Sequence, residues 1–294
     1  MGEAPGAPVR QEIIDLYDAY VRMRTDRSAF LHRLAELAGG AAEADALLPR
    51  LENAHNPARV RPDHHDLVSL RVQYEGGSGA LVGYLARRRG RLDAMPPVLL
   101  VHDNRGLSPH VEDVARRLAM AGYLVLAPDL LSPRGGTPAG EALARRLVGE
   151  LEEVAVAADL TASVTWLRAH REGHGRVGCL GFGWGGGCVQ RLAAFGIDLA
   201  AVVAYYGAAP PVAAVPRIRA PLLLHYAGFD EPVNRDIAAF EAALREAGKR
   251  FTVHRYEDVH HGFHDHHGGA RHDPEAAELA WARTLRFLEE HLAA

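Results

Sequence analysis

The sequence has few cysteines and lacks long apolar runs. Of its 294 residues only Cys179 and Cys188 are cysteines; the first falls in a predicted buried strand and the second in the helix that follows. We therefore expect no disulfide framework and a reducing, cytoplasmic compartment. No apolar run approaches the roughly 18 residues that a membrane-spanning helix needs, so we expect no transmembrane segment.

The chain also lacks a strong excess of charge of either sign. It carries 33 basic and 37 acidic side chains, well mixed along the sequence, for a formal net charge of -4. Nucleic acids and anionic membranes bind basic patches, and no basic stripe is present, so we expect neither partner. A small-molecule substrate fits this composition better, and 48% hydrophobic residues are enough to bury a substantial core.

From residue 67 onward, strand-like apolar runs alternate with helical patterns. Such alternation predicts an α/β fold, in which a mainly parallel sheet of about eight strands is covered by helices on both faces. The predicted strands cover 68–74, 80–86, 98–102, 123–127, 177–181, 201–206, 222–227 and 251–256. The predicted helices cover 110–121, 137–170, 184–195, 234–247 and 274–292.

Amphipathic helical patterns precede this alternation. A polar, proline-bearing stretch at 53–66 then reads as a linker. We therefore expect an N-terminal helical extension and linker over residues 1–60 and an α/β domain over residues 61–294.

Within the extension, Thr25 and Asp26 are candidate caps of a helix. The apolar residues Phe30, Leu34 and Leu37 follow at helical spacing and predict a buried face. We expect this face to pack on the domain or on a second subunit, which would give a homodimer through the N-terminal helices.

The segment G-C-L-G-F-G-W-G-G-G at 178–187 has the form of a hydrolase nucleophile elbow. In such an elbow, a strand turns sharply into a helix and holds one residue with a strained backbone, so that its side chain enters the pocket. Gly183 occupies this position, where it accepts a positive φ without steric cost. Glycine offers neither sulfur nor oxygen, so covalent catalysis at residue 183 is excluded.

Two other interpretations fit these glycines. A plain glycine-rich turn, with a phosphate bound at the helix N-terminus, fits the ten residues about equally well. The dinucleotide pattern G-x-G-x-x-G is also matched, but it belongs on the first strand of a Rossmann fold, with an acidic residue about 20 positions later. Since this segment lies near the fifth strand, we expect no cofactor.

Two further loops supply an acid and a histidine. Ligands of parallel sheets bind beyond the carboxyl ends of the strands. Asp230 follows the seventh predicted strand and His261 the eighth, which is the α/β-hydrolase order of elbow, acid and histidine. We expect Asp230 to orient the imidazole of His261 and His261 to move protons.

Six motifs together resemble the dienelactone hydrolase, or carboxymethylenebutenolidase-like, family over residues 67–292. They are V-H-D-N-R-G-L at 101–107, A-P-D-L at 127–130, G-F-G-W-G-G at 181–186, Y-Y-G at 205–207, Y-A-G-F-D-E at 226–231 and H-G-F-H at 261–264. The resemblance implies an α/β-hydrolase fold and hydrolysis of a small lactone or ester. It places the nucleophile position at Gly183, where the family has cysteine, and a further carboxylate at Asp103, where the family has glutamate.

The same resemblance implies which groups bind the substrate. The main-chain amides of Trp184 and Asn104 would stabilise an oxyanion. The side chains expected to contact the substrate are Arg105, Arg134, Trp184 and Tyr206. Arg134 stands one residue away from the position of the family's carboxylate-binding arginine.

Because residue 183 has no nucleophile, three functions stay open. The first is hydrolysis of a small lactone or ester by a water molecule that fills the space left by the missing side chain. His261, helped by Asp103 or Asp230, would deprotonate this water. The second is isomerisation or cyclisation with His261 as the base, and the third is ligand binding without catalysis. Cys188 does not replace the nucleophile, because five residues of helix displace it by roughly 7 Å.

Histidine is abundant, with 17 residues in the chain. Candidate metal ligands gather at His260, His261, His264, Asp265, His266, His267 and His272. Zinc sites recruit such residues, but adjacent histidines on a glycine-rich loop have no fixed ligand geometry. We therefore expect a solvated loop and no metal.

Overall fold

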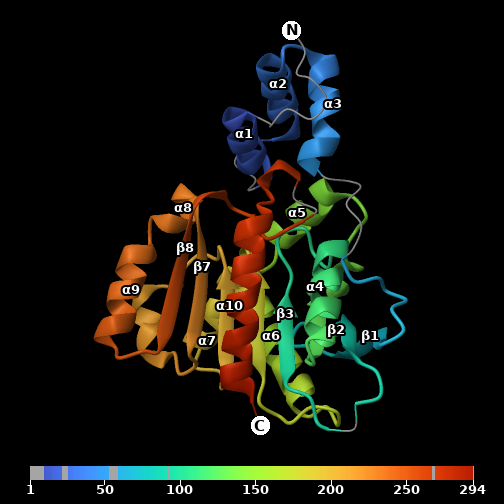
Figure 1. Cartoon of the computed structure of the whole chain (residues 1–294), viewed down its shortest axis with the longest axis vertical. Helices are drawn as coiled ribbons and strands as arrows, with labels where there is room; N and C mark the ends of the chain where they lie inside the picture. Colours follow the sequence, from blue (N-terminus) through green and yellow to red (C-terminus); the bar gives the residue numbers. More distant parts are fainter. Residues whose placement is uncertain (1–9, 22–25, 53–58, 92, 267–268, 294) are drawn as a thin grey trace.

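The computed structural model describes residues 10–21, 26–52, 59–91, 93–266 and 269–293 (Figure 1). Its centre is an eight-stranded sheet with the strand order β1-β2-β4-β3-β5-β6-β7-β8. The first two strands pair antiparallel with each other, and β2 pairs antiparallel with β4, whereas β4, β3, β5, β6, β7 and β8 run parallel. The predicted α/β-hydrolase fold with a mainly parallel sheet is confirmed.

All eight strands lie where the apolar runs predicted them. Their bounds are β1 Leu67–Glu75, β2 Ala80–Arg88, β3 Pro97–Val101, β4 Leu124–Asp129, β5 Gly178–Phe182, β6 Ala201–Tyr205, β7 Leu222–Phe229 and β8 Phe251–His260. Several strands run past their predicted ends, and β8 runs furthest, because β7 and β8 continue to pair as far as Phe229 and His260, past an irregularity in register.

Helices cover both faces of the sheet. On one face α4 (Pro109–Met120) and α10 (Pro274–Leu292) share a core with the sheet, and Figure 1 shows both in front of the strands. On the other face lie α6 (Glu153–Arg168), α7 (Trp184–Ala194) and α9 (Ile237–Glu246).

Shorter elements connect these layers. They are α5 (Glu141–Gly149), α8 (Glu231–Asn234) and the 3-10 turns η1 (Ser132–Arg134), η2 (Val212–Arg217) and η3 (Gly269–Arg271). The single helix predicted over 137–170 is wrong, since this stretch forms two helices, α5 and α6. The first ends at Gly149, a residue with low helix propensity.

Three N-terminal helices form a small core of their own. They are α1 (Gln11–Val21), α2 (Arg27–Ala38) and α3 (Ala41–Glu52), and Asp26 caps α2 by accepting a hydrogen bond from the Ala29 amide at 2.9 Å. Phe30 and Leu34 are fully buried as expected, whereas Leu37 is only half-buried. Residues 53–58 of the predicted linker lie outside the described residues.

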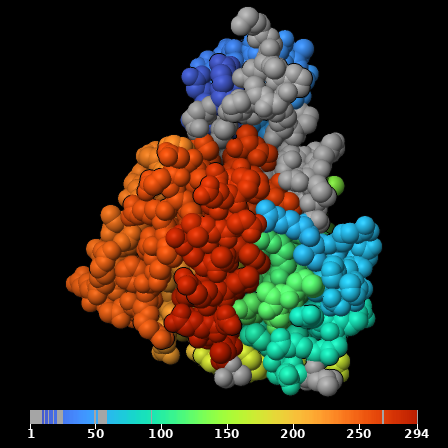
Figure 2. Space-filling model, viewed as in Figure 1, coloured from blue at the N-terminus to red at the C-terminus, as the bar shows by residue number. Residues whose placement is uncertain are grey.

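These helices lie beyond the carboxyl ends of the strands. Figures 1 and 2 show them as a lobe at the top of the molecule. The lobe packs against Ala270 in η3, and Asp15 lies 3.8 Å from His260 at the end of β8. Whether the lobe also joins two subunits stays a prediction.

Both cysteines are buried and free, as expected. Within the described part of the chain, no helix combines the length and the apolar character that crossing a bilayer requires. The cytoplasmic location stays a prediction.

Direct backbone contacts hold the turn between β5 and α7. A Cβ atom added at Gly185 would lie 2.2 Å from the carbonyl oxygen of His102, and one added at Gly181 would lie 2.3 Å from the carbonyl oxygen of Gly185. These main-chain carbonyl groups, one just after β3 and one in α7, cannot move away as the end of a flexible side chain could. Glycine is therefore required at these positions by space, which fixes where α7 starts relative to the sheet.

The substitution Gly185→Ala tests this requirement. We expect it to lower the free energy of unfolding by at least about 2 kcal/mol, because the added methyl group overlaps main-chain atoms. Gly187→Ala, two residues later in the same helix, is the matched control, since its nearest neighbour is the end of the flexible Arg191 side chain, at 3.2 Å. Urea unfolding of both variants measures the difference, and equal stabilities would contradict the argument.

Candidate active site

A cavity of about 40 Å³ lies at the carboxyl-terminal edge of the sheet. Its walls come from the loop after β3 (103–105), the elbow (182–184), Tyr206 after β6 and the loop after β8 (261–265). A water molecule needs roughly 10–15 Å³ of such space. The cavity therefore has room for water.

Gly183 forms the apex of the elbow, with φ 52° and ψ -114°. This is the positive φ that the sequence predicted, and the amide of Gly183 donates to the carbonyl of Tyr205 at 3.0 Å. A Cβ atom added here would lie 3.1 Å from Nε2 of His261. The missing side chain would thus point at the imidazole.

His261 and Asp230 form the predicted pair. Nδ1 of His261 lies 2.7 Å from Oδ2 of Asp230, whose side chain is fully buried, while 18% of the His261 side chain is exposed. The carboxylate accepts a hydrogen bond from Nδ1–H, so the unprotonated Nε2 is left facing Gly183. This orientation is the one that a general base requires.

Tyr206 forms another wall of the cavity beside His261. The two rings lie 4.7 Å apart, and Tyr206 has a strained backbone with φ 38°. Burial raises the pKa of the Tyr206 hydroxyl well above its usual value, so the phenol is neutral. The structure therefore places Tyr206 where the sequence expected a substrate contact.

Asp103 and Arg105 form a buried ion pair. The carboxylate of Asp103 accepts hydrogen bonds from Nη2 of Arg105 at 2.6 Å, from Nε at 3.0 Å and from the main-chain amide at 2.8 Å. Burial tends to raise the pKa of this carboxyl, but the Arg105 guanidinium outweighs it and lowers the pKa. Asp103 is therefore a weak base, and Asp230 is the carboxylate that supports His261.

The guanidinium of Arg105 is shared with other acids. It donates to Oδ2 of Asp265 and lies 3.8 Å from Glu141. Arg105 lines the cavity as expected, but these carboxylates hold it in place. A substrate carboxylate would have to compete with them.

Arg134 lies away from the cavity, which corrects its assignment as a substrate contact. It stands in η1 and donates to the side chain of Glu150 at 3.1 Å and to its carbonyl at 2.9 Å. The turn after β4 directs this side chain toward the end of α5. The one-residue offset from the family's carboxylate-binding arginine therefore goes with a different position of the side chain.

The two predicted oxyanion donors both line the cavity. Trp184 is the first residue of α7, so its N–H lies before the helical hydrogen-bond pattern begins. Asn104 lies in the loop after β3 and also lines the cavity. The Trp184 ring stacks on His102, with 5.6 Å between the ring centroids. Trp184 borders both this cavity and the pocket between α6 and α7, so its contact with a substrate stays a prediction.

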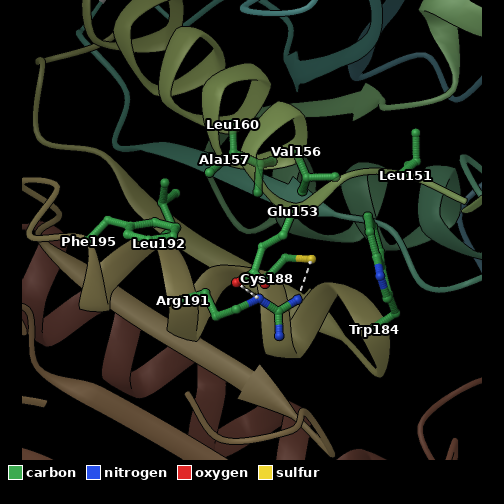
Figure 3. Close-up of a pocket in the computed structure, with 10 residues that line it drawn as sticks. All are labelled: Leu151, Glu153, Val156, Ala157, Leu160, Trp184, Cys188, Arg191, Leu192 and Phe195. Carbon is green, nitrogen blue, oxygen red and sulfur yellow. Dashed lines mark hydrogen bonds and ion pairs between the residues drawn. The ribbon is translucent and has the colours of Figure 1, made fainter. Parts of the chain in front are cut away.

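Cys188 belongs to a different pocket, shown in Figure 3. This pocket of about 240 Å³ lies between α6 and α7, with Trp184 at its edge. Sγ of Cys188 accepts a hydrogen bond from Arg191 at 3.3 Å, and burial raises the pKa of its thiol to about 11. As the sequence indicated, this thiol does not replace the missing nucleophile.

The loop after β8 is buried, so the expectation of a solvated loop is wrong. His260, His264, Asp265 and His266 are each at most 6% exposed. His264 packs between Phe182 and Trp281, at 5.0 and 5.7 Å between ring centroids. His267 lies outside the described residues, and His272 is half-buried.

Sequence reasoning missed His110 and Arg271, which also line the cavity. His110 is the second residue of α4, directly after a serine and a proline that start the helix. Proline at the first helical position is a known start signal. That signal could have placed His110 at the same sheet edge as the other site residues.

Comparison with known proteins agrees with this geometry. The model of the dienelactone hydrolase family matches residues 81–292. A protein named putative carboxymethylenebutenolidase from Escherichia coli is 30% identical over 71% of this chain and 82% of its own length. A Bradyrhizobium protein named probable 2-oxo-3-(5-oxofuran-2-ylidene)propanoate lactonase is 30% identical over 72% of this chain and 90% of its own.

Solved structures lead to the same family. A crystal structure of a putative dienelactone hydrolase from Klebsiella pneumoniae has a TM-score of 0.70 and 27% identity, covering 76% of this chain and 99% of that one. The dienelactone hydrolase from Anabaena variabilis has a TM-score of 0.61 and 26% identity, covering 78% and 100%. The chain therefore belongs to the dienelactone hydrolase family of the α/β-hydrolases, which are hydrolases of the lactone and ester type.

Proposed function

We propose that this chain hydrolyses a small lactone or ester with a water molecule in place of the nucleophilic side chain. The observation that carries the proposal is the distance of 3.1 Å between Nε2 of His261 and the Cβ position of residue 183. A water in the cavity that Gly183 and His261 line would lie within reach of the imidazole. Nδ1 of the same ring is 2.7 Å from Asp230, which stabilises the imidazolium when Nε2 takes a proton.

The proposed substrate class rests on the rate that such a site can supply. A positioned general base contributes typically 10²- to 10⁴-fold. The amides of Trp184 and Asn104 lie in the same cavity and would stabilise the oxyanion that forms when water attacks a carbonyl. These contributions suit an activated lactone or ester better than an amide, and the names of the relatives point to the same class.

We further propose that residues 1–60 form a helical extension that covers the site of a domain spanning 61–294. Arg271 lines the cavity, and its guanidinium lies 5.0 Å from the ring centroid of Tyr17 in α1. Arg271 thus lies between the extension and the cavity and contacts both. Because a lactone or ester needs more room than the cavity of about 40 Å³ provides, a substrate would enter when this cover or the loop beneath it shifts.

Removing the imidazole tests the proposed base. We expect His261→Ala to lower hydrolysis of an aryl ester or dienelactone by about 10²- to 10⁴-fold. The natural chain should resist thiol reagents, because its site has no thiol. His32→Ala, on the exposed face of α2, is the control.

Three other results would point elsewhere. Turnover without incorporation of solvent oxygen would indicate isomerisation or cyclisation. Ligand binding without turnover would indicate a binding protein that has no catalytic activity. Hydrolysis that survives His261→Ala would contradict the assigned base.

Restoring a thiol tests the rest of the machinery. We expect Gly183→Cys to raise the hydrolysis rate at least about 100-fold over the natural chain and to make it sensitive to thiol reagents, because attack then becomes covalent. The positive φ costs a non-glycine residue about 1–2 kcal/mol, so a lower melting temperature should accompany the gain.

Gly183→Ala is the matched control for that variant. It carries the same backbone strain but no thiol, and its methyl group takes space from the water. Its activity should therefore fall below that of the natural chain. An equal gain from alanine and cysteine would contradict the proposal.

A chain that begins at Arg59 tests the extension. We expect it to be less stable, because Ala270 and Arg271 lose their partners, and to hydrolyse bulky esters with a lower KM, because the cavity opens. Urea unfolding, steady-state kinetics and gel filtration measure stability, access and subunit number. Unchanged stability and KM would remove any role for the extension at the site.

A further inference from the structure

We propose that His110, Asp265 and His266 form a binding site for one zinc ion in the wall of the same cavity. Each residue offers a ligand atom, and the three atoms lie within 4.8 Å of one another. The residues are buried, with exposed fractions of 2%, 4% and 3%. Buried imidazole nitrogens that converge with a carboxylate are the usual ligand set of zinc.

Two separate elements bring the three ligands together. His110 comes from the start of α4, whereas Asp265 and His266 come from the loop after β8. Arg105 holds Oδ2 of Asp265, and Oδ1 lies 2.9 Å from Nδ1 of His110. One carboxylate oxygen is thus fixed by a hydrogen bond while the other faces a second ligand, which is how proteins orient metal-binding carboxylates.

The spacing suits a tetrahedral ion after small side-chain movements. Zinc binds nitrogen and oxygen at about 2.0–2.2 Å, which puts neighbouring ligand atoms roughly 3.4 Å apart. Nδ1 of His110 and Oδ1 of Asp265 are 2.9 Å apart, and all three ligand atoms lie within 4.8 Å of one another, so small movements would reach that value. Asp113 lies 3.7 Å from Nε2 of His266 and provides a carboxylate behind this ligand.

A neighbouring histidine supports the site independently. His264 is 1% exposed, and its ring lies 5.8 Å from that of His110. Neither of its ring nitrogens has a hydrogen-bond partner among the residues that the structure describes. Buried polar atoms are normally satisfied, and a zinc-bound water would give this imidazole a partner.

The position of the site gives the ion a role, and this role rests on the proposed function. His110 and Asp265 line the cavity together with Gly183 and His261. Three protein ligands leave a fourth position for water, whose pKa a bound zinc lowers to about 7. Such a water would supply the nucleophile that residue 183 lacks.

Metal binding is tested on the full-length protein after treatment with a chelator. We expect equilibrium dialysis against zinc to give one tightly bound ion, and cobalt to give the intense visible absorption of a four-coordinate site. His110→Gln and His266→Gln should each weaken this binding at least about 100-fold. His64→Gln is the matched control, because His64, His65 and Asp66 form a surface group that could also hold an ion.

The possible outcomes test zinc binding and the catalytic role of the zinc separately. No stoichiometric zinc, or tight binding that is lost in His64→Gln and kept in His110→Gln, overturns the proposal. If the glutamine variants fail to fold, Asp265→Asn, which keeps the shape of the side chain, should show the same loss. Zinc binding without an effect of the chelator on hydrolysis leaves the site in place and removes its catalytic role, whereas the His261 dependence tests the proposed function separately.

Discussion

The site depends on the direct contact of bare backbone around the turn from β5 to α7. A Cβ atom at Gly186 would lie 2.7 Å from the carbonyl oxygen of Tyr205, and one at Gly207 would lie 2.3 Å from the carbonyl carbon of Gly186. No side chain separates these segments, so the apex at Gly183 has one position relative to the neighbouring strands. The distance from this apex to His261 is set by the sheet rather than by flexible side chains.

A buried guanidinium then ties two walls of the cavity together. Arg105 pairs with Asp103 in its own loop and with Asp265 in the loop after β8. Removing one partner of a buried ion pair leaves an uncompensated charge, which costs about 3–5 kcal/mol. Asp103, the acid that the family resemblance placed near the nucleophile, is thus held by Arg105, whereas the carboxylate that contacts His261 is that of Asp230.

The sequence predicted those parts of the site that follow from topology. The carboxyl ends of parallel strands meet at one edge, so strand order alone brought Gly183, Asp230 and His261 together. The sequence-based prediction failed for Arg134, because the direction of its side chain depends on a local turn. It also failed for the histidine-rich loop after β8, which was expected to be solvated. Histidine counts as polar in any pattern, and only the packing of His264 between Phe182 and Trp281 shows that this loop is buried.

Loss of the nucleophile changes one step of the family's chemistry and leaves the rest of the geometry in place. The acid, the imidazole and the amide donors are fixed by β3, β7, β8 and the start of α7, none of which needs a side chain at residue 183. In hydrolases whose triad is removed, the oxyanion site and binding alone retain a rate advantage of about 10³- to 10⁴-fold over water. Glycine also frees the apex from the cost of a positive φ and leaves space for water beside His261. In the function proposed above, the glycine that excludes covalent attack at residue 183 would also leave room for attack by water.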